Sequence, residues 1–193
     1  MNIGIDLDDV IADFFPSLLT NYNTRFKTNH KVSDLKVFKY STLWNVSSEE
    51  AIKRTDEFHQ SHDIKELPVV RGAKEAIEQL MQKHHLTIIT SRPSRFKEKV
   101  KIWLTHHITN QKIEIIHAGD FHKGQGATKA QICEELQIPI MIEDAPETAL
   151  QCAESGIHVI LFDMPWNQAL THKNITRIHS WKEALKVIDE MKQ

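Results

Sequence analysis

Residues 2–10 read NIGIDLDDV, a short apolar run that ends abruptly in acidic side chains. A strand buried on both faces of a parallel sheet is apolar throughout, so residues 2–6 are predicted to form such a strand with an exposed carboxyl end. Asp6, Asp8 and Asp9 crowd the exit of that strand. Like charges at this spacing oppose one another's ionisation unless a cation lies between them. The stretch therefore predicts a buried parallel strand with a cation-binding position at its end.

Apolar runs of the same kind recur four more times along the chain. They cover residues 86–90, 113–117, 140–143 and 157–162. Helical patterns separate them, with Pro93 and Pro146 in first-turn positions and Ser180 ahead of a last helix. This alternation predicts an α/β fold, a Rossmann-like core with a five-stranded parallel sheet and helices on both faces.

The stretch between the first two strands is far longer than the dozen or so residues that one crossover helix needs. Phe14, Leu18 and Tyr22 recur at every fourth residue, which indicates an amphipathic helix, and Ser47 begins a capping box ahead of a second one. We predict a small all-helical cap subdomain over residues 15–68, inserted after the first strand. Residues 1–14 and 69–193 then form the core domain.

The composition of the chain limits the kinds of binding partner that we expect. A chain of 193 residues with 40% hydrophobic and 26% charged residues suits one globular core with an insertion, and a net charge of −2 lacks the basic excess of proteins that bind nucleic-acid polymers. There is no signal-like or membrane-spanning apolar run, and Cys133 and Cys152 form no CxxC pair. We expect a cytoplasmic protein with reduced thiols, a small-molecule substrate, and neither a membrane nor a polymeric nucleic-acid partner. The oligomeric state stays open, a homodimer included.

Polar residues follow two further strands of the predicted sheet. Thr90, Ser91 and Arg92 follow the second strand, and Glu143 and Asp144 end the fourth. In open α/β sheets the ligand crevice lies outside the carboxyl ends of the strands, so these groups are expected to face the acids after the first strand. Carboxylates suit a hard cation, whereas hydroxyl and cationic groups suit an anion. The combination predicts a site for phosphate with Mg²⁺.

These motifs resemble the four ordered motifs of the haloacid dehalogenase (HAD) superfamily: DLDDV at residues 6–10, a threonine ending the second strand, a lysine opening a later helix, and Glu143-Asp144. More narrowly, residues 5–23 (IDLDDVIADFFPSLLTNYN), the helical insertion and the compact length look like the 5'(3')-deoxyribonucleotidases and their bacterial nucleotidase relatives. The resemblance covers nearly the whole chain. It implies an Mg²⁺-dependent 5'-nucleotidase that dephosphorylates (deoxy)ribonucleoside monophosphates through an aspartyl phosphate. A phosphatase of sugar phosphates or other small phosphomonoesters is the alternative.

The resemblance also implies roles for the acids. Asp6 attacks phosphorus as the nucleophile, while Asp8 protonates the leaving oxygen and then deprotonates the water that hydrolyses the intermediate. The metal ligands would be the Asp6 carboxylate, the Asp8 backbone carbonyl and Asp144, with Glu143 bound directly or through water. The family commonly has glycine at the position of Asp9. Two interpretations of Asp9 stay open: a partner of the metal ligands, or a solvated side chain.

The remaining roles concern the phosphoryl group and the base. Thr90 would donate a hydrogen bond to a phosphoryl oxygen, helped by Ser91 and Arg92. The motif lysine is Lys129, which opens a helix, or Lys123 in the loop before it, and Lys129 suits the family better.

Aromatic residues of the insertion offer stacking surfaces for a nucleobase. Base–aromatic stacking contributes about 1–3 kcal/mol in nucleic-acid sites. Phe14 and Trp44 are the candidates for the substrate side, and packing inside the cap is the competing interpretation.

A signalling receiver domain also gathers acids, threonine and lysine around a metal. Receivers place the phosphoacceptor after a later strand and lack a long helical insertion, so the sequence favours an enzyme.

Overall fold

A computed structural model describes residues 1–61, 63–109, 113–119 and 126–191 of the chain. Its centre is a six-stranded sheet in the order β3-β2-β1-β4-β5-β6, in which all neighbouring strands run parallel. The strands are β1 (Asn2–Ile5), β2 (His85–Thr90), β3 (Glu114–His117), β4 (Ile140–Glu143), β5 (His158–Phe162) and β6 (Ile175–Ile178).

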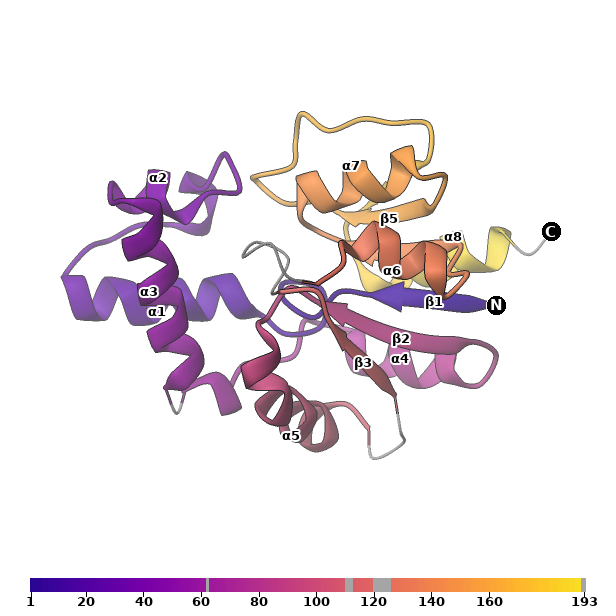
Figure 1. Ribbon diagram of the computed structural model, residues 1–193, viewed down its shortest axis with the longest axis horizontal. Coiled ribbons are helices and arrows are strands. Elements are labelled where there is room, and N and C mark those ends of the chain that lie inside the picture. The colour runs from indigo at the N-terminus through magenta and orange to yellow at the C-terminus, as the bar shows by residue number, and fades with distance from the viewer. Residues whose placement is uncertain (62, 110–112, 120–125, 192–193) are drawn as a thin grey trace.

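Helices cover both faces of this sheet, and a further group of helices gathers beside it (Figure 1). The helices are α1 (Phe14–Phe26), α2 (Tyr40–Trp44), α3 (Ser48–Gln60), α4 (Ala73–Met81), α5 (Lys97–His107), α6 (Lys129–Glu135), α7 (Pro146–Glu154) and α8 (Trp181–Glu190), with short 3-10 turns at Val32–Asp34, Asp63–Lys65 and Ser94–Phe96. Helix α4 packs against β2 and α8, whereas α7 packs against β4, β5 and α6.

The strands are apolar because both of their faces are buried. Along β4, Ile140 and Ile142 belong to the hydrophobic core on the side of α4 and α8, while Met141 belongs to the core beneath α6 and α7. Ile88 and Ile89 of β2 divide in the same way. Successive side chains of a strand point to opposite faces, so a continuous apolar run is required where both faces are covered.

The predicted fold class is confirmed, with one difference in the strand count. All five predicted strands are present within a residue at either end, but β6 was not predicted. Its sequence, ITRI, includes the partly exposed Arg177, and three of its four residues are only half-buried. An edge strand pairs on one side only, so its apolar signal is weak.

Helices α1, α2 and α3 form the helical region between β1 and β2. The Ser47 hydroxyl accepts the backbone N–H of Glu50 at 3.1 Å, so Ser47 is the N-cap of α3 as predicted, but the Glu50 carboxylate pairs with Arg54 and does not complete the predicted capping box. Within the region, the rings of Tyr22 and Trp44 stack with centroids 4.3 Å apart. Helix α1 begins one residue before the predicted boundary, and the division into core and cap stays a prediction.

The helical region is joined to the core by side-chain contacts. Lys99 of α5 donates from Nζ to the carbonyl of His59 at 2.8 Å, near the end of α3. The Trp103 indole donates to the carbonyl of Leu67 at 3.0 Å. Across the described ranges, no helix combines the length and the apolar character needed to cross a membrane.

Candidate active site

The register of the sheet brings the first acids together. Strand β1 pairs with β4 so that Ile5 lies opposite Ile142, and the next residues along the two strands are Asp6 and Glu143. The backbone N–H of Asp6 donates to the carbonyl of Ile142 at 2.9 Å, which continues the pairing by one residue. The chain leaves β1 for β2 on one side and later returns to β4 on the other. This is the kind of switch point where open α/β sheets bind ligands.

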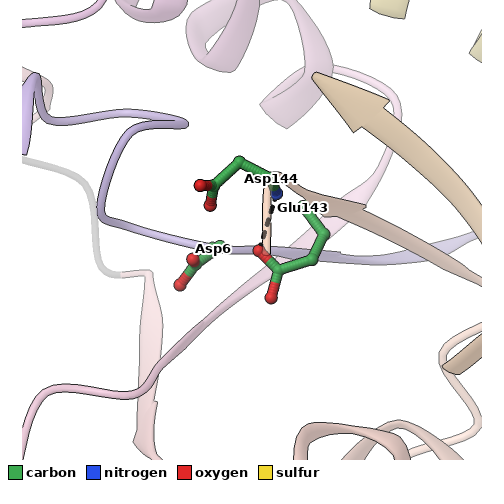
Figure 2. A group of neighbouring side chains, drawn as sticks. All are labelled: Asp6, Glu143 and Asp144. Carbon is green, nitrogen blue, oxygen red and sulfur yellow. Dashed lines mark hydrogen bonds between the residues drawn. The ribbon is translucent and has the colours of Figure 1, made fainter. Parts of the chain in front are cut away.

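Asp6, Glu143 and Asp144 form what we call the acidic cluster. One carboxylate oxygen from each lies within 4.8 Å of the others, and all three side chains are buried (Figure 2). Burial, together with the charge of Glu143, raises the pKa of Asp6 and of Asp144 well above the ordinary aspartate value. Burial and mutual repulsion thus oppose the ionisation of these acids, and a metal ion held by the cluster would favour it.

Lys129 is the cation that balances part of this charge. Its Nζ lies 2.6 Å from Oδ1 of Asp6 and 2.9 Å from Oε1 of Glu143, and the side chain is buried. Burial by itself would lower the pKa of Lys129, but the charges of Asp6 and Glu143 raise it above the ordinary lysine value. The residue is the first of α6, whose start is fixed by a capping box on Thr128. The competing candidate, Lys123, lies outside the described residues.

Glu143 is held on both of its carboxylate oxygens. Oε1 accepts the bond from Lys129, and Oε2 accepts the backbone N–H of Asp144 at 2.8 Å, the dashed line in Figure 2. Asp144 in turn directs its backbone carbonyl and Oδ2 towards the residues that follow β5, as described below.

Asp8 lies outside the acidic cluster. Its carboxylate is bonded by the guanidinium of Arg92, whose Nε donates to Oδ1 at 3.1 Å and to Oδ2 at 2.9 Å. The backbone carbonyl of Asp8 was predicted to be a metal ligand, and this stays a prediction. Thr90, at the carboxyl end of β2, is fully buried, and its hydroxyl accepts the backbone N–H of Arg92 at 3.1 Å. Ser91 between them is exposed.

Asp9 has a structural task that the sequence left open. Its φ of 60° lies in the left-handed region, where glycine, asparagine and aspartate are tolerated best. The buried carboxylate accepts the backbone N–H of Phe15 at 2.8 Å, so it caps the first turn of α1. Burial is the main cause that raises the pKa of Asp9 well above its ordinary value. Asp13 occupies the N-cap position itself but makes no side-chain cap bond.

Substitutions at Asp9 should separate backbone strain from capping. We expect Asp9→Asn to stay within about 1 kcal/mol of the wild type, because asparagine tolerates the left-handed backbone and keeps a side-chain acceptor. Asp9→Ala should lose about 1–3 kcal/mol, since it combines the strained φ with an unpaired N–H, and Asp9→Gly should fall between them because it relieves only the strain. Urea denaturation midpoints of the three variants test this, and an alanine variant as stable as the asparagine variant would contradict it.

The two aromatic residues predicted for the substrate side are enclosed by protein. Phe14 is 3% exposed and stacks on the ring of His59 at 5.0 Å, and Trp44 is 5% exposed and stacks on Tyr22. Their contact with a base stays a prediction that requires these stacks to open. Burial, and after it the charges of the acids, Asp9 first among them, raise the pKa of the Tyr40 hydroxyl above the ordinary tyrosine value.

Three residues that the sequence did not single out hold Asp144 in place. The Trp166 indole donates to Oδ2 of Asp144 at 3.1 Å and to its carbonyl at 3.2 Å, while Asn167 donates from Nδ2 to the same carbonyl at 2.8 Å. Arg177 of β6 donates to Oδ1 of Asn167 at 2.6 Å. Trp166 and Asn167 follow the carboxyl end of β5, so extending the strand-end rule to that strand could have found them.

Comparisons with known proteins place this geometry in a family context. The family model described as "5' nucleotidase, deoxy (Pyrimidine), cytosolic type C protein" matches residues 1–193, the whole chain. The protein BH1399 of Halalkalibacterium halodurans is 29% identical over 97% of this chain and 92% of its own length. A nucleotidase of Clostridium acetobutylicum is 27% identical over 99% of this chain and 95% of its own length.

Solved structures share the fold at lower sequence identity. A haloacid dehalogenase-like hydrolase from Streptococcus pneumoniae superposes with a TM-score of 0.69 at 17% identity, over 97% of both chains. The HAD hydrolase YfnB from Bacillus subtilis, which was solved bound to magnesium, superposes with a TM-score of 0.62 at 13% identity, over 97% of this chain and 98% of that one.

Proposed function

The chain belongs to the 5' nucleotidase family of deoxy (Pyrimidine), cytosolic type C proteins, within the HAD superfamily of hydrolases, and from that membership we propose that it hydrolyses nucleoside 5'-monophosphates with Mg²⁺. The single observation that carries the proposal is the acidic cluster at the β1–β4 switch point with the Nζ of Lys129 between Asp6 and Glu143. A carboxylate that is buried, paired with a lysine and located at the switch point of the sheet suits nucleophilic attack on phosphorus.

The donor set of the cluster fits Mg²⁺. All three side chains offer carboxylate oxygens, which hard cations prefer, and the raised pKa values of Asp6 and Asp144 mark charge that a cation would relieve. Asp6 and Asp144 would hold the ion, with the Asp8 carbonyl. Glu143 would act through water, because both of its oxygens already accept hydrogen bonds. When bound, the ion supplies positive charge that lets an anionic phosphate approach an anionic nucleophile.

The protein's own residues then divide the reaction. Asp6 attacks phosphorus and becomes an aspartyl phosphate, and Lys129 offsets the charge that develops on the phosphoryl oxygens. Thr90 donates to one of those oxygens. Asp8 gives a proton to the leaving 5'-oxygen and later takes one from the attacking water. The helical region between β1 and β2 serves as a cap over this site.

Substrate preference is tested with a panel of phosphate esters in the presence of Mg²⁺. We expect the highest kcat/KM for nucleoside 5'-monophosphates, with deoxyribonucleotides and ribonucleotides compared base by base. Sugar phosphates at equal concentration serve as the competing class. Turnover of sugar phosphates together with failure on every nucleotide would overturn the nucleotide assignment and leave a phosphatase of small esters.

The hydrogen bond from Trp166 to Asp144 gives a prediction on metal affinity. Trp166→Phe keeps a ring against Phe15, whose centroid lies 5.5 Å away, but removes the N–H that orients the carboxylate. Groups that orient metal ligands typically contribute 10- to 100-fold to affinity, so we expect Mg²⁺ to bind about 10-fold more weakly by isothermal titration calorimetry.

Trp103→Phe is the matched control for that variant. It also deletes a buried indole donor, the one that bonds the carbonyl of Leu67. This donor makes no hydrogen bond to the acidic cluster. We expect it to lower stability without changing the Mg²⁺ affinity. If both variants bound the ion as tightly as the wild type, the Trp166 bond would have no role in metal binding.

A further inference from the structure

The ion pair between Asp8 and Arg92 has a built-in asymmetry. The side chain of Arg92 is 2% exposed, whereas that of Asp8 is 23% exposed. The guanidinium therefore approaches the carboxylate from the protein interior. The opposite side of the Asp8 carboxylate stays open to solvent. A substrate that enters from solvent meets Asp8 before it can reach the guanidinium.

Arg92 is also fixed along its whole length. Its backbone N–H donates to the Thr90 hydroxyl at 3.1 Å, and its carbonyl accepts a hydrogen bond from Nδ1 of His117 at 2.9 Å. A Cβ on Gly119 would collide with the backbone of Arg92, so the loop after β3 packs closely against it. The guanidinium carbon lies 5.4 Å from the centroid of the Phe14 ring. These contacts fix the backbone of Arg92 and place the Phe14 ring against its guanidinium.

The fork of the guanidinium fixes both oxygens of Asp8. Nε donates to Oδ1 at 3.1 Å and to Oδ2 at 2.9 Å, and Nη2 also donates to Oδ1. Two parallel donors define the plane of a carboxylate, which a single ammonium group cannot do. General acid catalysis requires the acid within hydrogen-bonding reach of the leaving oxygen, so the orientation of this carboxylate matters directly.

We propose that Arg92 is a positioning residue, which holds the carboxylate of Asp8 in the orientation from which it gives a proton to the leaving oxygen. The proposal rests on the proposed phosphatase chemistry and deepens it. It assigns Arg92 a different task from the phosphate contact that the sequence predicted. The buried location of the guanidinium behind Asp8 supports the new task over the earlier one.

Two esters with different leaving groups test this role. Nitrophenolate departs without a proton, whereas the alkoxide of an alkyl phosphate needs one, and kcat/KM covers the steps through its departure. For Arg92→Lys and Arg92→Gln we expect kcat/KM to fall by about 30- to 100-fold on an alkyl phosphate and by less than about 5-fold on p-nitrophenyl phosphate. If Arg92 instead bound the phosphoryl group, its substitution would lower both kcat/KM values equally, because the two esters share that group.

The alkyl phosphate used in this test is whichever one the wild type hydrolyses fastest, a nucleotide or another ester. A wild type that ignores nucleotides would therefore overturn the nucleotide assignment while the Arg92 test still runs. Arg95→Lys is the matched control, since Arg95 pairs with Asp56 of α3, is partly exposed and has no contact with Asp8 in the described residues. Both of its kcat/KM values should stay within about 2-fold of the wild type.

Equal losses on both esters, with an unchanged thermal midpoint, would overturn the proposal. A second measurement covers variants that fold poorly. In an Asp8→Asn background, Arg92→Lys should change kcat/KM on the alkyl ester by less than about 2-fold, because the group it positions is already gone. A further loss as large as in the wild-type background would show that Arg92 acts elsewhere.

Discussion

Asp6→Asn is expected to lower kcat on every phosphate ester by about 10⁴- to 10⁶-fold, the range seen when a covalent nucleophile is removed from other hydrolases. The substitution keeps the size of the side chain and one oxygen, but an amide is a poor nucleophile towards phosphorus. Asp6 is buried, with its Oδ1 2.6 Å from the Nζ of Lys129. Steady-state assays with Mg²⁺ measure the effect.

A mass measurement makes the same test sharper. Wild-type enzyme quenched during turnover should carry one phosphoryl group on Asp6, and the variant should carry none. Asp13→Asn is the control, because Asp13 is a half-buried acid nearby that makes no side-chain cap bond, and its activity should stay within about 2-fold. An Asp6→Asn enzyme that keeps a tenth of wild-type turnover would exclude the covalent mechanism.

Lys129→Met should have the second largest effect, on stability as well as on activity. Removing one partner of a buried ion pair typically costs 3–5 kcal/mol, because the remaining charges are left uncompensated. Here two carboxylates, Asp6 and Glu143, would lose their common cation. We therefore expect the free energy of unfolding to fall by about 3–5 kcal/mol without metal and kcat to fall by about 10²-fold or more.

Magnesium should reverse part of the stability loss in that variant. A cation bound to the acidic cluster supplies charge that the methionine variant lacks, so saturating Mg²⁺ is expected to raise its urea midpoint more than that of the wild type. Lys182→Met, at an exposed position of α8, is the control and should change the stability by no more than about 0.5 kcal/mol. The lack of any Mg²⁺ response in both the wild type and the methionine variant would argue against a metal at the cluster.

Much of the fold was predictable because its signals are local. The apolar runs of β1 and β4 identify strands buried on both faces, and the N-cap residue Ser47 marks the start of α3. The acids follow directly from where those strands end, since parallel strands expose their carboxyl ends at one edge. Strand β6 was missed because an edge strand needs little apolar sequence and includes the partly exposed Arg177.

The α/β class, the helical insertion and the set of acids at the sheet edge could be predicted from the sequence, because strand periodicity, helix caps and strand ends are properties of neighbouring residues. Which of these groups meet could not be predicted in this way. The Nζ of Lys129 lies between Asp6 and Glu143, Arg92 holds Asp8, and Trp166 holds Asp144. The physical reason is that these contacts join different elements, so they depend on strand register and helix packing. Asp9 combines both levels, since its left-handed backbone is local but the helix start that it caps is six residues away.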